Sequence, residues 1–428
     1  MIPVFKKDKV GFINRVRKDN FLDNEKVFDT VTAIMKDVRK NKDQAILDYT
    51  KKFDKIDLKA DELLVSKEEI KQAYERIDKD LLKIIQKAII NVATYSLKQK
   101  EESFLWEKEE GVKIGQKVTP IKSAGLYIPG GTAPLISSVI MNAVPAYVAG
   151  VKEIIMCSPP PLDDARIVAA NEAHVTKIYK VGGAQAIFAL AFGTETIPKV
   201  DKISGPGNIY VSYAKKLAYG YCGIDMVAGP SEIMIIGDNT ANPKFIAADM
   251  LGQAEHDPLS VASFLTTDES LVDKVKAEIM SQSKRLERKD IVLKSIRNNS
   301  AIYIGDTITE CIDLLNDCAP EHAEIMTKDA DFYSDFITQA GAVFVGSYTP
   351  ESVGDYFAGP NHTLPTAGTA RFFSPLGIYD FMKKSSVIEY SKEALKKVYK
   401  DVAYFARQEE LEAHARALDI RFEGENDE

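Results

Sequence analysis

Hydrophobic and polar positions recur at helical spacing in the first part of the chain, and farther on helical spacing alternates with short strand-like runs. Near the amino terminus, apolar residues at helical spacing predict two long helices, over about 29–53 and 66–100. From Gly111 onwards, short apolar runs alternate with helical segments, which is the pattern of β-α-β units with parallel sheets. The predicted strands lie at 112–118, 153–157, 177–181, 200–203, 232–236, 260–265, 301–304, 323–326 and 342–345.

This alternation predicts an α/β fold with two Rossmann-like, incomplete α/β domains and small helical extensions at both ends. Residues 1–22 form the predicted N-terminal extension, and 377–428 form a C-terminal helical domain. A first, discontinuous α/β domain comprises 23–127, with the long helices, and 232–376. The second α/β domain, 128–231, is inserted into the first.

Three predicted strand ends in the inserted domain lead into glycine-rich turns followed by helices, at Gly130-Gly131, Gly182-Gly183 and Gly205-Pro206-Gly207. Such turns bring backbone N–H groups and the positive end of a helix towards a ligand, as nucleotide sites require. None of them is a G-x-G-x-x-G motif, and tight turns of any α/β domain explain the glycines nearly as well. The polar residues near the turns favour a ligand-binding face; they are Tyr127, Gln185 and Asn208.

Composition and charge narrow the class of protein. A chain of 428 residues with 45% hydrophobic residues can form more than one core. The net charge of -8 and the pI near 5.4 argue against a nucleic-acid partner. No apolar run is long enough for a membrane span, and no signal peptide is visible at the start, so we expect a cytoplasmic protein without a membrane partner.

The candidate chemistry lies in the second half of the chain. Gln253 and His256 occupy positions i and i+3 on the last turn of a predicted helix, although an ordinary helix end explains a histidine there as well. With Asp355 and His414 they could form a cation site, and two imidazoles, a carboxylate and an amide suit zinc, manganese or iron. The pair Glu321-His322 follows a proline and could supply a base and activate water, but taken alone the pattern favours an ordinary surface pair.

The ordered set of motifs is more specific than any single one. It comprises the glycine-rich turns, Gln253-x-x-His256, Pro320-Glu321-His322, Gly354-Asp355-Tyr356, Gly359-Pro360-Asn361-His362 and Glu409-x-Leu411-x-Ala413-His414. This set, which extends over nearly the whole chain, resembles the histidinol dehydrogenase family.

The resemblance implies a zinc-dependent, NAD-linked homodimer that oxidises L-histidinol through L-histidinaldehyde to L-histidine, the last steps of histidine biosynthesis. It implies that His322 is the base and that Glu321 activates water. One zinc ion per subunit would be held by Gln253, His256, Asp355 and His414. NAD would bind to the inserted domain and be contacted by Gln185, Asn208 and the adjacent Tyr127. These zinc ligands would also contact the substrate, together with Ser231, His322, His362 and Glu409. The C-terminal domain would dock on the partner subunit, so that Glu409 and His414 complete the partner's site.

Two other classes of function fit the same residues without the resemblance. A metal-dependent hydrolase of a small polar substrate would use Glu321 to activate a metal-bound water, and its activity would not need NAD. A two-domain binding protein would use the long loop between its lobes for ligand capture, and its Glu/His pairs would have no catalytic role.

Overall fold

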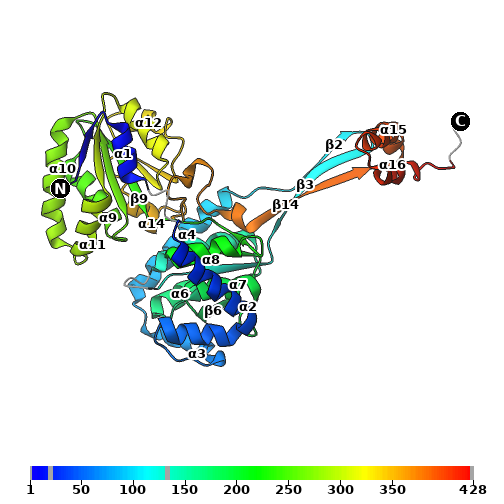
Figure 1. Cartoon of the computed structure of the whole chain (residues 1–428), viewed down its shortest axis with the longest axis horizontal. Coiled ribbons are helices and arrows are strands. Elements are labelled where there is room, and N and C mark those ends of the chain that lie inside the picture. The colour runs from blue at the N-terminus through cyan, green and yellow to red at the C-terminus, as the bar shows by residue number, and fades with distance from the viewer. Residues whose placement is uncertain (1, 18–22, 131–134, 425–428) are drawn as a thin grey trace. The chain divides into compact units, whose positions relative to one another are not determined.

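The computed structural model describes residues 2–17, 23–130 and 135–424, and the chain divides into two compact units (Figure 1). The first unit comprises 1–99 and 121–381, and the second comprises 100–120 and 382–428. The chain therefore enters the second unit twice. Within the described residues, no helix is both long and apolar enough to cross a membrane.

A five-stranded parallel sheet forms one half of the first unit. Its strands are β4 (Ser123–Tyr127), β5 (Glu153–Ser158), β6 (Lys177–Lys180), β7 (Lys202–Ser204) and β8 (Gly223–Ile224), in the order β6-β5-β4-β7-β8. The connecting helices are α5 (Ile136–Ala149), α6 (Asp164–Glu172), α7 (Gly183–Phe192) and α8 (Ile209–Ala218).

The long N-terminal helices belong to this same half. They are α2 (Glu25–Phe53), α3 (Lys67–Arg76) and α4 (Lys79–Lys98). Helix α2 packs on α7 and α8, α3 packs on α6, and α4 packs on α5. The apolar stripe of α2, with Val27, Val31 and Ile34, is part of the core that covers the five-stranded sheet.

A six-stranded parallel sheet forms the other half of the first unit. Its strands are β1 (Val4–Lys6), β9 (Glu232–Gly237), β10 (Val261–Thr266), β11 (Ala301–Ile304), β12 (His322–Met326) and β13 (Ala342–Val345), in the order β1-β11-β10-β9-β12-β13. One face is covered by α9 (Pro243–Ala254), α10 (Glu269–Gln282) and α11 (Lys289–Asn299), and the other by α1 (Lys9–Val16) and α12 (Ile308–Cys318) (Figure 1). The short helices α13 (Ala330–Ser334) and α14 (Glu351–Tyr356) follow β12 and β13.

The second unit combines an antiparallel sheet with two helices. The sheet has the order β14-β3-β2, from β14 (Met382–Tyr390), β3 (Val112–Pro120) and β2 (Phe104–Glu109). Helices α15 (Lys392–Gln408) and α16 (Glu412–Asp419) pack on each other through Ala403, Ala406 and Ala415.

The predicted α/β class with parallel sheets is confirmed, and the sheets group the chain differently from the predicted domains in three places. Residues 23–127 do not join 232–376, because their helices and β4 build the five-stranded half. The predicted extension 1–22 instead supplies β1 and α1 to the six-stranded half. Residues 18–22 of this extension lie outside the described residues, as does Gly131 of the first predicted glycine-rich turn. The C-terminal domain is not only helical, because β14 pairs along its whole length with β3. Hydrophobic spacing shows that an element packs on one face, but not which sheet receives it.

Candidate active site

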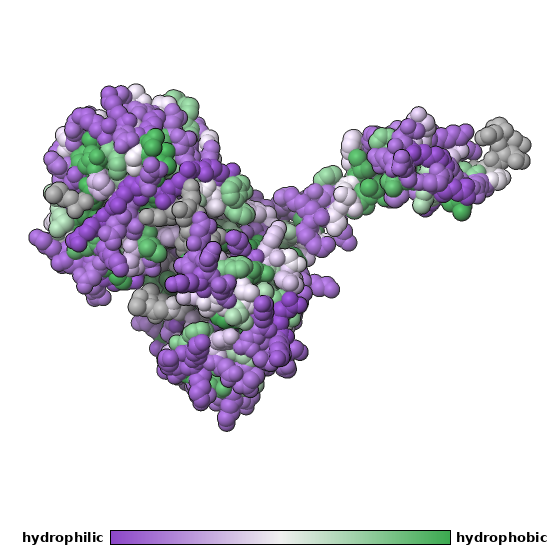
Figure 2. All heavy atoms as spheres, viewed as in Figure 1, coloured by the Kyte–Doolittle hydropathy of each residue, from purple (hydrophilic) through white to green (hydrophobic). Residues whose placement is uncertain are grey.

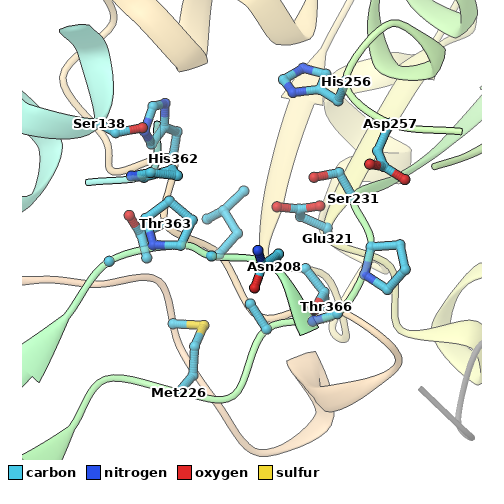
Figure 3. A pocket seen from close by; sticks show the side chains of 18 of the residues that line it. Ser138, Asn208, Met226, Ser231, His256, Asp257, Glu321, His362, Thr363 and Thr366 are labelled. Atoms are coloured by element: carbon cyan, nitrogen blue, oxygen red, sulfur yellow. Dashed lines mark hydrogen bonds between the residues drawn. The ribbon is translucent and has the colours of Figure 1, made fainter. Parts of the chain in front are cut away.

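The largest group of candidate residues lines a cavity of ≈ 1070 Å³ within the first unit (Figure 3). Pro129 and Gly205 reach it just after β4 and β7, at the carboxyl edge of the five-stranded sheet. Ser231 and Glu321 reach it just before β9 and β12, at the amino edge of the six-stranded sheet. The cavity therefore lies between opposite edges of two parallel sheets.

Glu321 is buried beside Ser231 at this amino edge (Figure 3). Its Oε2 accepts a hydrogen bond of 3.0 Å from the backbone N–H of Glu232. Burial raises the pKa of Glu321 well above its usual value, and the nearby carboxylates of Glu232 and Asp355 act in the same direction. A carboxyl group with a raised pKa can exchange a proton closer to neutral pH than an ordinary glutamate does.

His322 is 3% exposed and has one free ring nitrogen. Its Nδ1 lies 3.1 Å from the carbonyl oxygen of Glu232 and 2.9 Å from Oε1 of Gln253. A carbonyl oxygen can only accept, so Nδ1 carries the proton of the neutral ring and Nε2 carries the lone pair. Burial lowers the pKa of His322 to about 3, which keeps the ring neutral near pH 7. Within the described part of the chain, Nε2 is buried without a hydrogen-bond partner, 3.9 Å from Oδ1 of Asp355, and it is available as a base.

Two of the predicted zinc ligands, His256 and Asp355, lie together with Glu351, and their ligand atoms are all within 4.8 Å of one another. Burial raises the pKa of Asp355 to about 6, and His256 opposes this shift. Gln253 is fully buried nearby, with Oε1 on His322 and Nε2 without a partner. An imidazole, two carboxyl groups and an amide are a donor set that fits a zinc ion.

The other predicted contacts divide between the two units. His362 lies in the cavity, with Nδ1 3.0 Å from the carbonyl oxygen of Asp355 and Nε2 3.5 Å from the hydroxyl of Ser138 (Figure 3). Burial lowers the pKa of His362 to about 4, so this ring is also neutral near pH 7. Glu409 and His414 belong to the second unit, where both side chains are exposed.

The three predicted NAD-contacting residues line a second cavity of ≈ 740 Å³ at the carboxyl edge of the five-stranded sheet. Gln185 is 1% exposed, and neither its Oε1 nor its Nε2 has a hydrogen-bond partner among the residues that the structure describes. The hydroxyl of Tyr127 accepts from the backbone N–H of Gly183 at 3.1 Å. Gly183 has φ +66°, which favours glycine, and a Cβ there would lie 2.6 Å from Oε1 of Gln185, so a larger residue would displace this amide.

Asn208 lines both cavities and ends a turn that a buried ion pair holds in place. Its side chain caps α8, accepting from the backbone N–H groups of Tyr210 and Val211. At the start of the turn, Lys215 donates to the carbonyl oxygen of Gly205 at 2.9 Å, and Asp225 accepts from the N–H of Gly205 at 2.9 Å. Lys215 and Asp225 also contact each other, so one ion pair fixes both backbone groups of the turn.

Comparisons with known proteins decide what this arrangement is. The family model for histidinol dehydrogenase matches residues 17–422. A histidinol dehydrogenase from Clostridium acetobutylicum is 50% identical, over 96% of this chain and 99% of its own. One from Bacillus subtilis is also 50% identical, over 92% of each chain. The chain belongs to the histidinol dehydrogenase family.

A solved structure agrees with this membership. The crystal structure of histidinol dehydrogenase from Elizabethkingia anophelis superposes with a TM-score of 0.92 at 39% identity, over 99% of each chain. As a member of the histidinol dehydrogenase family, the chain is an NAD-linked oxidoreductase of histidine biosynthesis. The predicted activity is confirmed, and the hydrolase and the binding protein are set aside.

Two buried carboxyl groups in this family member were missed by the sequence reasoning. Oε1 of Glu351 lies 3.7 Å from Nδ1 of His322 and 4.0 Å from Nε2 of His256. Glu324 on β12 is 1% exposed, and it accepts from the backbone N–H of Glu351 at 2.8 Å, which holds the start of α14. A glutamate inside the apolar run Ala323-Glu324-Ile325 was a usable signal, because charged residues are rarely buried without a partner. Glu351 carried a weaker signal, its i, i+4 spacing from Asp355.

Proposed function

We propose that this chain oxidises L-histidinol through L-histidinaldehyde to L-histidine, with two molecules of NAD as hydride acceptors. The observation that supports this most is the pair Glu321 and His322, a buried carboxyl group beside a neutral imidazole whose Nε2 is free. The two oxidations need a base for the alcohol and a group that activates water for the aldehyde, and these two side chains can fill both roles.

His322 is the proposed base. In the first oxidation its Nε2 takes the hydroxyl proton of the alcohol while a hydride leaves the same carbon for NAD. In the second oxidation it takes a hydroxyl proton of the hydrated aldehyde, and a second hydride leaves. The hydrogen bonds of Nδ1 to Glu232 and Gln253 fix the tautomer that this role needs and support the positive charge that forms on the ring.

Glu321 is the proposed activator of water between the two oxidations. Its carboxylate takes one proton from water as the oxygen bonds to the aldehyde carbon. The aldehyde oxygen becomes the second hydroxyl by taking the proton that His322 gained in the first oxidation, which makes the imidazole neutral again, and Glu321 releases its proton to solvent. The backbone N–H of Glu232 holds Oε2 of Glu321. The raised pKa of Glu321 makes its carboxylate a stronger base than a solvated one.

Zinc would be held by Gln253, His256 and Asp355 of the first unit and by a His414 side chain. Bound there, it would supply a Lewis acid that positions the imidazole and amine of the substrate. The clustering of His256 and Asp355 supports this assignment. Ser231 and His362 line the same cavity and are proposed to contact the substrate with the zinc ligands.

NAD is proposed to bind in the second cavity, against Tyr127, Gln185 and Asn208. The unpartnered amide of Gln185 is a buried polar group that a ligand can satisfy. Asn208 lines both cavities, so a dinucleotide that passes this residue reaches the substrate cavity.

We further propose a cytoplasmic homodimer in which the second unit of each chain completes the site of its partner with Glu409 and His414. The second unit supports this, because its helix pair is held by alanines and large side chains stay exposed on it (Figure 2). These side chains are Phe104, Leu105, Trp106, Val402, Tyr404 and Phe405. A unit of this size with so small a core gains stability when it docks on a larger surface.

NADH absorbance with L-histidinol as the substrate tests the proposed reaction. We expect about two NADH for each histidinol consumed, as a four-electron oxidation requires, and loss of activity after incubation with a chelator that zinc restores. A ratio of one NADH, or full activity in the chelated, metal-free protein, would contradict the proposal.

A further inference from the structure

One wall of the second cavity is the carboxyl end of α2, where Phe53 and Asp54 line the space. Asp54 is the C-terminal cap of this helix, and its backbone N–H donates to the carbonyl oxygen of Thr50 at 2.9 Å. Among the residues that the structure describes, its Oδ2 is buried without a hydrogen-bond partner and Asp54 forms no ion pair. Such a carboxyl group is expected to have an external partner.

The walls of this cavity differ in charge. The carboxyl end of α2 carries the negative end of the helix dipole, and Asp54 adds its own negative charge there. Gly183 and Asn208 lie at the amino ends of α7 and α8, which carry the positive ends of their dipoles. The wall at α2 therefore favours hydrogen-bond donors, and the walls at α7 and α8 favour an anionic group.

The cavity has a single cationic lining residue within the described part of the chain, and that residue is already satisfied. Arg166 donates to a carboxylate oxygen of Asp163, to the hydroxyl of Ser158 at 2.9 Å and to the carbonyl oxygen of Pro161 at 3.2 Å. Its side chain is 7% exposed. Arg166 therefore does not neutralise Asp54, and its guanidinium N–H groups are already used, so they are not offered to an additional phosphate group.

We infer that Asp54 determines the choice of dinucleotide: its carboxylate accepts hydrogen bonds from the adenosine ribose diol and excludes a dinucleotide that carries a phosphate on that ribose. This inference rests on the proposed NAD position in the second cavity. A ribose diol offers two O–H donors to an unpaired carboxylate, whereas a ribose phosphate brings a like charge against Asp54 and the helix end. Phe53, beside Asp54, offers an aromatic face to the attached base.

The test compares kcat/KM for NAD and for NADP in the full-length, zinc-loaded enzyme and in Asp54→Ser. Asp48→Ser is the matched control. Asp48 is exposed on the same helix, outside the cavity, and its replacement removes the same charge. Each preparation is assayed with both dinucleotides, so the ratio of the two values does not depend on the folded fraction. We expect the preference for NAD to fall at least about tenfold in Asp54→Ser and to stay unchanged in Asp48→Ser.

Gln185→Ala separates failure of this inference from failure of the proposed NAD position. If Gln185→Ala raises the KM for NAD while Asp54→Ser leaves the NAD/NADP ratio unchanged, the role of Asp54 is wrong and the cavity is still the NAD site. If neither variant affects either dinucleotide, the cavity itself is wrong. An equal loss with NAD and NADP in Asp54→Ser would also overturn the inference, because it would show a structural role without discrimination.

Discussion

The two parallel sheets of the first unit contribute to the site from opposite edges. The five-stranded sheet presents the carboxyl ends of β4 and β7, which is the usual ligand-binding edge of an open α/β sheet. The six-stranded sheet presents the amino ends of β9 and β12, where Ser231, Glu321 and His322 lie. The segment 225–231, which connects β8 to β9, leads directly from the carboxyl edge of the five-stranded sheet to the amino edge of the six-stranded sheet.

The two edges also differ in chemistry. The carboxyl edge supplies glycine-rich turns, helix amino ends and neutral amides, and Asp54 is the one acidic side chain among the described residues that line its cavity. The amino edge supplies buried carboxyl groups and neutral imidazoles whose pKa values are displaced by burial. This difference indicates a division of labour, with cofactor binding at one edge and proton transfer at the other.

The largest expected effect concerns the amino edge. Glu321→Gln should lower the rate of aldehyde oxidation by about 10²–10⁴-fold, because the amide cannot take a proton from water. The oxidation of histidinol to the aldehyde should fall much less. Rapid-quench measurement of the two steps gives both rates. The control is Glu255→Gln, the same change beside His256 in a residue without a proposed role, and it should retain both rates. Normal aldehyde oxidation by Glu321→Gln would remove this residue from the chemistry.

A second experiment asks whether the amino edge needs the second unit of a partner. Glu321→Gln and His414→Ala should each be nearly inactive alone in forming L-histidine from L-histidinol, and His414→Ala should also lose zinc. If the sites are shared, mixed and refolded subunits should regain up to about a quarter of the wild-type rate, because half of the dimers are mixed and each has one intact site. Mixtures that stay inactive although mixed dimers form would show that each chain completes its own site.

The carboxyl edge should be sensitive to its buried ion pair. Lys215→Met leaves Asp225 buried without its cation and should lower the free energy of unfolding by about 3–5 kcal/mol. Urea titration measures this, and Lys51→Met, in the exposed pair with Asp57, is the control expected to show no measurable change. The double variant Lys215→Met/Asp225→Leu should be more stable than Lys215→Met. An equal or larger loss in the double variant would contradict the role assigned to the pair.

The smallest expected effect is a pH dependence of NAD binding. Burial raises the pKa of Asp54 from 3.8 to about 6, so its carboxylate gains a proton as the pH falls below 6. Protonation removes the charge that the ribose diol needs, and the KM for NAD should therefore rise by up to about tenfold between pH 7 and pH 5. Asp54→Asn should lack this rise. The same rise in the variant would assign it to another group.

Much of the fold could be predicted from the sequence, because strands such as 301–304 and 342–345 are short apolar runs with clear helical segments between them. The grouping of these elements into sheets could not be predicted, because it depends on long-range packing. Val4–Lys6 is a strand only because it pairs with Ala301–Ile304, and three residues carry no periodicity.

The site was less accessible to sequence reasoning. His256, Asp355 and Glu321 were identified through the order of motifs, since their spacing alone allowed ordinary surface positions. Asp54 lies in the charged run Lys51-Lys52-Phe53-Asp54-Lys55, where a solvated helix end is the natural interpretation. Only the packing of α2 against the five-stranded half shows that this carboxyl group faces a cavity.

The most direct test of the division of labour is the dissociation constant for NAD, measured by titration calorimetry in Gln185→Ala and in His256→Ala. Gln185→Ala changes the carboxyl edge of one sheet, and His256→Ala changes the cluster at the amino edge of the other. The account predicts that Gln185→Ala weakens NAD binding at least about tenfold and that His256→Ala leaves it within about twofold. The reverse pattern, with NAD binding lost in His256→Ala and kept in Gln185→Ala, would contradict it.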